Sequence, residues 1–166
     1  MLDFIISAYN QSILKYELSK MLEKASELSE DQKYSQALKY YENVLRVAPV
    51  NITAIINYGV TLQNLARLKH ALEMYDIALT IQPKNMSALI NKGTVLHTME
   101  KFSEAISCYN TVLRLDEKNT IALVCKGLSH GEMGNIVSAI KYFKKALSID
   151  SQNQLAQISF STAKRS

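Results

Sequence analysis

Proline, glycine, cysteine and tryptophan are all scarce in this sequence. Its 166 residues include two prolines, five glycines, two cysteines and no tryptophan. So few turn-forming residues argue against a β-sandwich or barrel and favour long helices. Cys108 and Cys125 are 17 positions apart, which fits neither a zinc site nor a disulfide framework. We therefore expect no metal, no cofactor and a reducing, cytoplasmic environment.

Long hydrophobic runs are also missing. No apolar stretch approaches the roughly 20 residues that a membrane-spanning helix needs, so we expect no membrane span. Residues 1–10 contain Asp3 and no basic residue, and no small-residue cleavage site follows, so we expect no secretory signal. Hydrophobic residues still make up 48% of the chain, which is enough to build a folded core.

Charge of either sign is spread along the chain, without a block of five like charges. There are 19 basic and 15 acidic residues, and the basic excess lies from Thr120 onward, where six basic residues face two acidic ones. Such an excess is usually a solvated face, but it could contact an acidic partner or nucleic acid. No aromatic residues interleave with these lysines to stack on bases, so we expect no nucleic-acid partner.

A 34-residue repeat organises residues 18–153. It divides them into four units without insertions: 18–51, 52–85, 86–119 and 120–153. Alanines, aromatic residues, glycines and asparagines each recur at this interval. These series are Ala37, Ala71, Ala105 and Ala139; Tyr41, Tyr75, Tyr109 and Phe143; Gly59, Gly93 and Gly127; and Asn51, Asn85, Asn119 and Asn153. Internal periods of this length indicate stacked repeats.

Each unit is predicted to form two helices joined by a short polar turn. Apolar residues recur at helical spacing and never alternate with period two, which excludes strands. Glycine and alanine would let the two helices approach closely, and the aromatic residue would fill space between units. The four recurring asparagines are expected to be N-caps, whose side chains accept free amide hydrogens. Pro49 and Pro83 are expected to end helices.

This unit resembles the tetratricopeptide repeat, and the resemblance covers residues 18–153. Tryptophan is never found at the fourth position of a unit, and Glu117 and Ser151 replace a late proline. The resemblance implies an all-α fold, a right-handed α-solenoid of four tandem helix-turn-helix repeats. The second unit carries most of the family pattern: Ile55, Gly59, Leu62, Ala71, Tyr75, Ala78 and Pro83.

The two ends of the chain are predicted to be helical as well. Residues 154–166 restart the repeat pattern and suit a C-terminal solvating helix. Residues 1–17 do not match a fifth repeat but carry an apolar stripe. The stripe is Leu2, Ile5, Ile6, Tyr9, Ile13 and Tyr16. This extension would either cap the first repeat or form a self-association surface, since exposed apolar stripes are unusual on monomers.

No catalytic constellation is evident. His70, His97 and His130 lie on different predicted elements, and none has metal-ligand spacing. His130 occupies a position that is usually aromatic in its unit, which predicts a packed core residue. The segment from Gly131 to Gly134 lacks the lysine and hydroxyl of a phosphate loop. We therefore expect no enzymatic activity and no catalytic residues.

The resemblance implies that the first helix of each unit lines a concave groove for extended segments of other proteins. An asparagine amide both donates and accepts, so Asn57 and Asn91 would suit a peptide backbone. Similar asparagine ladders line the superhelix of O-linked N-acetylglucosamine transferase. Ile56, Ile90 and Val124 would bury apolar side chains. The candidate groove residues are Ile56, Asn57, Val60, Asn64, Ile90, Asn91, Thr94, His97, Val124 and Leu128.

The groove has almost no lysine or arginine, which limits its partners. Co-chaperone repeats hold an acidic chaperone tail with a cationic clamp, and a carboxylate without a cation loses its charge-assisted bonds. The corresponding positions here are Leu22, Ser26, Asn57, Ser87 and Asn91. The expected function is a non-catalytic adaptor that binds a peptide or amphipathic helix other than such a tail. The alternative is a scaffold that self-assembles through the N-terminal helix or by end-to-end stacking.

Overall fold

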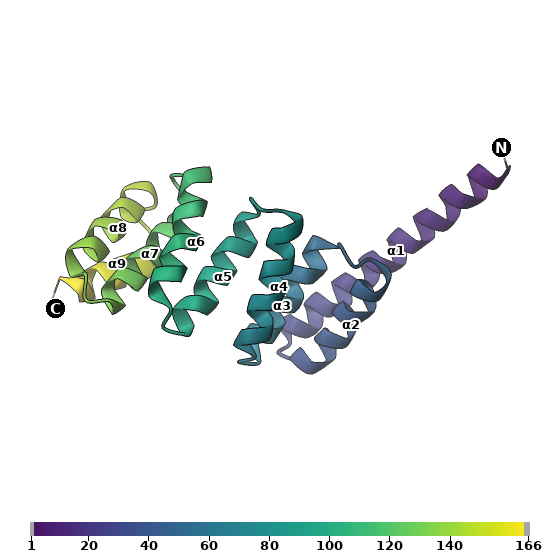
Figure 1. The fold of residues 1–166 in the computed structure, drawn as a ribbon, viewed down its shortest axis with the longest axis horizontal. Helices are drawn as coiled ribbons and strands as arrows, with labels where there is room; N and C mark the ends of the chain where they lie inside the picture. The colour runs from purple at the N-terminus through teal and green to yellow at the C-terminus, as the bar shows by residue number, and fades with distance from the viewer. Residues whose placement is uncertain (1, 165–166) are drawn as a thin grey trace. The chain divides into compact units, whose positions relative to one another are not determined.

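The computed structural model describes the backbone of residues 2–164 and the side chains of residues 11–164. Within these residues it contains helices and no strands, so the predicted all-α fold is confirmed (Figure 1). The helices are α1 (Leu2–Glu30), α2 (Tyr34–Val47), α3 (Ile52–Asn64), α4 (Leu68–Ile81), α5 (Met86–Thr98), α6 (Phe102–Leu115), α7 (Thr120–Glu132), α8 (Ile136–Ile149) and α9 (Gln154–Ala163).

The chain forms two compact units, one ending at Met74 and the other beginning at Tyr75, within α4. In the first unit α1 packs on α2 and α2 on α3. In the second, each helix from α5 to α9 packs on the next, and α7 also contacts α5 and α9. Packing between successive helices is the arrangement of an α-solenoid, and both units show it. The handedness and the count of four repeats remain predictions.

The predicted N-caps are present. The four asparagine side chains each accept a hydrogen bond from the backbone N–H three residues later, at 2.9–3.0 Å. They begin the first helix of a pair and, at the C-terminus, α9; they are Asn51, Asn85, Asn119 and Asn153. An N-cap satisfies a backbone donor that the helix itself leaves unpaired. The recurring asparagine therefore fixes where each of these helices starts.

The predicted close approach at the repeated glycine is also present in the second unit. A Cβ atom placed on Gly93 would lie 2.5 Å from the ring of Tyr109 on α6. The same atom on Gly127 would lie 2.5 Å from the ring of Phe143 on α8. Both distances are far below van der Waals contact, so only glycine fits. In these two repeats the aromatic residue thus packs on the glycine of its own first helix.

The turn inside each helix pair has one geometry throughout. The residue at its centre has a positive φ of 56–76° in all four cases: Gln32, Ala66, Glu100 and Gly134. The backbone N–H that follows donates to the carbonyl five residues earlier, as in Lys101 to Leu96 at 2.9 Å. Left-handed backbone favours glycine, which occurs only at the last turn. The sequence therefore predicts the position of these turns but not their shared conformation.

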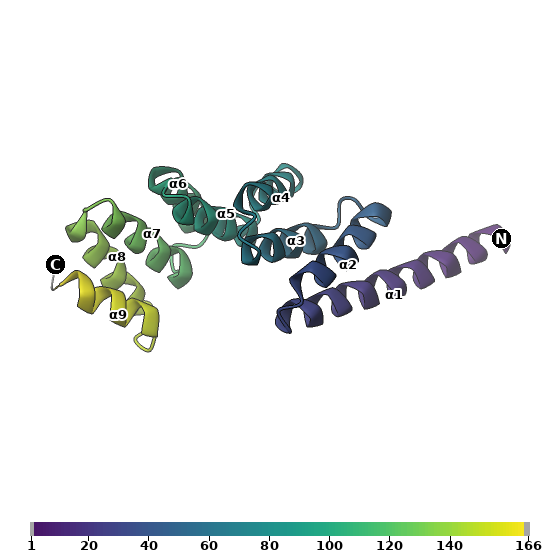
Figure 2. The same cartoon turned by 90° about the horizontal axis from the view of Figure 1, so that it is seen from below.

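Helix α1 runs without a break from residue 2 to residue 30, so the predicted extension and the first helix of repeat one are a single helix. Figures 1 and 2 show its first turns extending past the end of α2. The side chains of residues 1–10, which carry much of the predicted stripe, lie outside the described residues, as do residues 165–166. The described members Ile13 and Tyr16 are 44% and 57% exposed.

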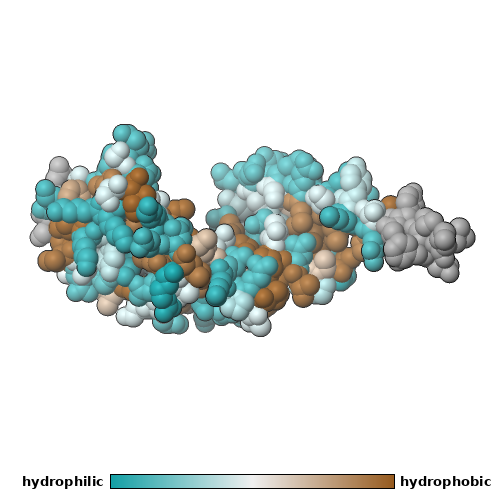
Figure 3. All heavy atoms as spheres, turned by 90° about the horizontal axis from the view of Figure 1, so that it is seen from above, coloured by the Kyte–Doolittle hydropathy of each residue, from teal (hydrophilic) through white to brown (hydrophobic). Residues whose placement is uncertain are grey.

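No helix among the described residues combines the length and the apolar character needed to cross a bilayer. On the face drawn in Figure 3, hydrophobic residues reach the surface in several groups between hydrophilic ones. Exposed hydrophobic groups of this kind mark where partners can bind when they line a concavity.

Candidate functional site

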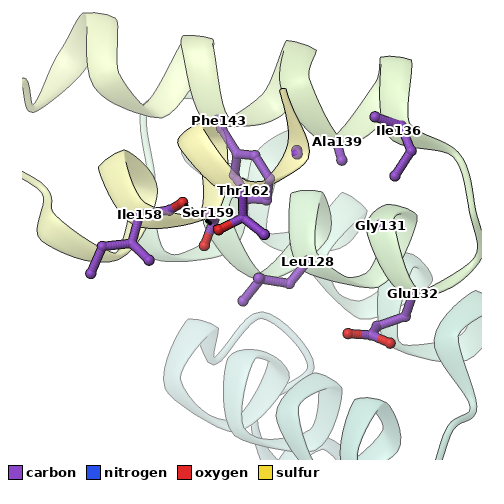
Figure 4. Close-up of a pocket in the computed structure, with 10 residues that line it drawn as sticks. Leu128, Gly131, Glu132, Ile136, Ala139, Phe143, Ile158, Ser159 and Thr162 are labelled. Carbon is purple, nitrogen blue, oxygen red and sulfur yellow. Dashed lines mark hydrogen bonds between the residues drawn. The ribbon is translucent and has the colours of Figure 1, made fainter. Parts of the chain in front are cut away.

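A groove opens in the second unit between α7, α8 and α9 (Figure 4). Its volume is about 310 Å³. We call it the α7–α9 groove; its walls are Leu128, Gly131, Glu132, Ile136, Ala139, Phe143, Ile158, Ser159, Thr162 and Ala163. In Figure 4, Leu128 and Glu132 extend from α7, while Ile158, Ser159 and Thr162 extend from α9. Side chains from three helices therefore converge on one space.

The groove is mainly apolar, with a single charged wall residue, Glu132. Gly131 has no side chain, so α7 leaves space open at this point. A Cβ atom placed on Gly131 would lie 3.9 Å from the Cβ of Ala139, which is an ordinary van der Waals contact. Ile158 on the opposite wall is 66% exposed. Concave, apolar surfaces with few polar groups are typical of binding sites. This groove suits an apolar side chain, with a cation as the complement of its carboxylate.

The predicted site residues lie on three helices in two units. In the first unit, α3 holds Ile56, which is buried, Asn57 and Val60, which are half-buried, and the exposed Asn64. In the second unit, half-buried residues lie on α5 and α7, and only Leu128 lines the groove. They are Ile90, Asn91, Thr94, His97 and Leu128.

Val124 lies inside the core of the second unit. It is only 2% exposed and belongs to the cluster formed with Leu123, Ala139, Phe143 and Ala156. Its side chain therefore supports the floor beneath Leu128 rather than offering surface of its own. The periodic pattern marks it as apolar, but periodicity does not separate groove floor from core.

Two predicted groove residues use their polar atoms within the protein. The Thr94 hydroxyl donates to the carbonyl of Ile90 at 3.0 Å. Nδ1 of His97 lies 2.9 Å from Oγ of Ser129 on α7. This hydrogen bond joins α5 to α7, the first helices of two neighbouring repeats. The His97 ring also packs edge-on against Phe102, with 5.2 Å between ring centroids. These contacts give both residues a structural role in the second unit.

Asn57 and Asn91 differ from these residues in that neither amide has a hydrogen-bond partner within the described part of the chain. Asn57 takes part in a hydrogen bond only through its backbone carbonyl, which accepts from the hydroxyl of Thr61 at 2.8 Å. Both amides are half-buried on the first helix of their pair. Each can therefore donate to and accept from a ligand backbone.

The wall formed by α9 is absent from the sequence-based prediction. Ile158, Ser159 and Thr162 occupy the fifth, sixth and ninth positions of a repeat that would begin at Gln154. Ile56, Asn57 and Val60 hold the same positions in the second unit and were predicted to line the groove. Extending the same register into the last helix would have identified all three residues.

Among the described residues, no three His, Cys, Asp or Glu side chains gather as a metal site would require. Burial raises the pKa of the thiol of Cys108 and of Cys125, so both are protonated near neutrality. A protonated thiol is a poor nucleophile and a poor metal ligand.

The family model "Tetratricopeptide repeat" matches residues 87–119 and 122–153. The chain contains tetratricopeptide repeats. These matches fall within the third and fourth predicted units; the boundaries of all four units and of both ends remain predictions. Tetratricopeptide repeats serve in general as non-enzymatic protein-interaction modules.

Comparison with curated proteins gives no match. Among solved structures, a tetratricopeptide repeat protein from Parabacteroides merdae is similar, with 22% identity, a TM-score of 0.78, and coverage of 89% of this chain and 59% of that one. MamA residues 41 to the end from Desulfovibrio magneticus share 18% identity, with a TM-score of 0.75 and coverage of 89% of each chain.

A third similar structure is the first tetratricopeptide repeat domain of Spaghetti (RPAP3), bound to the HSP90 peptide SRMEEVD. It has 18% identity, a TM-score of 0.66, and coverage of 69% of this chain and 90% of that one. At these identities the three structures establish a shared fold.

Proposed function

We propose that this protein is a non-catalytic adaptor that binds a segment of a partner protein in the α7–α9 groove. The observation that carries the proposal is the open apolar space of about 310 Å³ between α7 and α9. A leucine-sized side chain buried there would contribute about 1.5–3 kcal/mol. Stable capture therefore requires further contacts along the partner segment.

The charge of the groove selects the partner. Glu132 is its only charged wall residue, so a lysine or arginine of the partner would complement it. An acidic chaperone tail would instead meet a carboxylate. We therefore propose an apolar segment with a basic residue, either an extended peptide or an amphipathic helix, and no acidic tail.

Additional contacts are proposed separately in each unit. Asn57 and Asn91 present amides that suit a peptide backbone. On the same predicted face lie Ile56, Val60 and Asn64 on α3, and Ile90, Thr94 and His97 on α5.

A peptide-display selection tests the groove. Ile158→Asp places a charge on the α9 wall at a residue that is 66% exposed, so the fold is preserved. Val137→Asp is the matched control, because Val137 is 85% exposed and lies outside the groove. We expect peptides with an aliphatic or aromatic residue near a lysine or arginine to bind the wild type and Val137→Asp. The same peptides should not bind Ile158→Asp. Equal selection by all three proteins would refute the groove as the site.

Self-assembly is a second candidate, supported by the first unit. Ile13, Leu14 and Tyr16 are 44%, 47% and 57% exposed on the part of α1 that precedes its core contacts. The packing of α1 into the core of this unit begins only at Leu18. A second copy could bury these side chains.

Sedimentation velocity of the full chain across a range of concentrations tests this candidate. Assembly through α1 predicts a mass that rises with concentration in wild type and stays constant in a Leu14→Lys variant. A wild-type chain that remains monomeric throughout would exclude self-assembly.

A further inference from the structure

At one position of the repeat, the first helix of two units contacts the acidic residue sixteen positions earlier. Tyr58 donates a hydrogen bond to Oε1 of Glu42 at 3.0 Å in the first unit. Lys92 forms an ion pair with Asp76 in the second unit. The equivalent residue in the next repeat is Lys126, and sixteen positions before it lies Asn110, which carries no charge. The fourth repeat therefore keeps the cation and lacks the acid.

Lys126 is a nearly buried cation without a counter-ion. Its side chain is 9% exposed, and no ion pair or hydrogen bond to its ammonium occurs within the described residues. Its main contact is with the ring of Tyr142 on α8, where Nζ lies 4.2 Å from the ring centroid. A cation over a ring gains up to about 2 kcal/mol. Within the described residues, none of the three N–H groups of Lys126 donates to a protein acceptor.

His130 adds a second nitrogen without a partner, one turn further along α7. Its ring stacks on the same Tyr142, with 5.4 Å between centroids and planes 11° apart. Its Nδ1 is buried and has no hydrogen-bond partner. Burial, and then the charge of Lys126, lower the pKa of this imidazole. Two nitrogen groups thus lie at one aromatic ring, and no carboxylate pairs with either of them in the part of the chain that the structure describes.

The charge around this pair favours an anionic ligand. Helix α8 carries exposed Lys141, Lys144 and Lys145 and no acidic residue. None of Lys126, His130 and Tyr142 lines the α7–α9 groove, so the two surfaces are separate. His130 and Lys126 already occupy the ring of Tyr142, which leaves it a poor platform for stacking a nucleic-acid base.

We propose that Lys126, together with His130 on the ring of Tyr142, binds a carboxylate from an acidic segment of a partner protein. That carboxylate takes the place that Asp76 holds beside Lys92. It accepts a charge-assisted hydrogen bond from Nζ of Lys126. The basic surface of α8 attracts acidic segments as a whole, and the proposal requires none of its individual lysines. The site is independent of the groove and of the partner proposed for it.

The test follows the His130 and Tyr142 side-chain resonances by NMR during titration with a capped tetraglutamate peptide. Asn110→Asp supplies the missing acid within the chain and leaves Lys126 in place. Lys126→Gln removes the cation, and Lys141→Gln is the matched control that removes an exposed charge from α8. Inorganic phosphate and a single-stranded oligonucleotide are titrated in parallel.

We expect saturable shifts in wild type and an upward shift of the His130 titration midpoint, because a bound carboxylate offsets the charge of Lys126. Asn110→Asp and Lys126→Gln should each weaken peptide binding by about tenfold. Lys141→Gln should change it by less than about twofold.

Three results would overturn the proposal. If Lys141→Gln weakens binding as much as Lys126→Gln, the attraction is a diffuse property of the basic surface. If phosphate or the oligonucleotide binds at least as tightly as the peptide, the site does not select an acidic protein segment. If the resonances of wild type do not move with the peptide, no such site exists.

Discussion

The third and fourth repeats share a skeleton but differ at their polar positions. Both begin with an asparagine cap, and in both an aromatic ring packs on a glycine. A Cβ atom placed on either glycine would lie 2.5 Å from that ring. In the third repeat, Thr94 and Cys125 both act on the pKa of the buried Tyr109, so polar side chains surround its hydroxyl. The fourth repeat has Phe143 and Leu128 at these positions, and Leu128 lines the groove.

At two further positions the fourth repeat has a polar group without a hydrogen-bond partner among the described residues. Leu96 of the third repeat is buried at 3% exposure, whereas the fourth repeat has His130 with an unpartnered nitrogen. Lys92 forms an ion pair with Asp76, whereas Asn110 stands at the corresponding position for Lys126. Polar groups that are satisfied internally in one repeat are thus replaced or left open in the other. The shared positions maintain the fold, and the variable ones are where we propose that partners bind.

The largest expected effect comes from breaking what the two repeats share. Gly93→Ala and Gly127→Ala each force a methyl group to within 2.5 Å of a packed ring. Each should lower the free energy of unfolding by about 2–3 kcal/mol, and by similar amounts, because the two sites have the same geometry. Chemical denaturation monitored by circular dichroism measures both.

The control for these variants is Gly131→Ala on the same helix as Gly127. A methyl group there meets only the Cβ of Ala139, at 3.9 Å. Alanine is the better helix former, so this variant should be stabilised by about 0.5–1 kcal/mol. If all three variants lose stability equally, the loss is not due to the contact between ring and glycine.

The sequence predicted the shared positions because each is fixed by a local physical requirement that repeats every 34 residues. The N-cap asparagines and the close-packed glycines are examples, and both are confirmed. The left-handed residue at the centre of each turn was not predicted. Ala66 and Glu100 adopt this conformation without being glycine, because the helices on either side of the turn impose it.

The second prediction concerns a substitution that makes the fourth repeat like the others at position 130. His130→Leu restores the residue that the other three repeats have there and eliminates a buried nitrogen without a partner. We expect the free energy of unfolding at pH 7 to rise by about 1–2 kcal/mol. Thermal or chemical denaturation measures the change, and a loss of stability would show that stacking on Tyr142 outweighs the unpaired nitrogen.

The same variant has a defined pH dependence. The pKa of His130 in the folded chain is below the ordinary value of 6.5, because of burial and then Lys126. The unfolded chain therefore binds this proton at a higher pH, so stability falls as the pH drops below about 6.5 and levels off under the folded pKa. The advantage of His130→Leu over wild type should accordingly grow between pH 7 and pH 5.

The third prediction compares two asparagines in the fourth repeat. Asn119 caps α7 through its side chain at 3.0 Å, whereas Asn135 precedes α8 without a side-chain cap bond. Asn119→Ala should cost about 1 kcal/mol, and Asn135→Ala should be close to neutral. Denaturation midpoints separate the two, and equal losses would assign the effect to asparagine in general instead of to the cap.

The candidate site was only partly predictable. The repeat register placed Leu128 on a binding face, and the structure puts it in the groove. The register also included Val124 and His97, which the structure assigns to the core and to the contact with Ser129. A single sequence shows which residues share a helix face. It does not show which of their atoms are already used by neighbouring helices.

The smallest expected effect exchanges the polar pair of the third repeat for the apolar pair of the fourth. Burial raises the pKa of Tyr109, so its hydroxyl stays protonated, and Thr94 is one of the polar groups that act on it. Tyr109→Phe should cost about 1 kcal/mol, because Thr94 loses that contact. Thr94→Leu should cost a similar amount by leaving the tyrosine hydroxyl buried near a leucine. The double variant recreates Phe143 and Leu128, so its loss should be smaller than the sum by about 1 kcal/mol in a double-mutant cycle. Strict additivity would mean that Tyr109 and Thr94 are not coupled, and that the fourth repeat acquired its apolar wall without losing a polar contact.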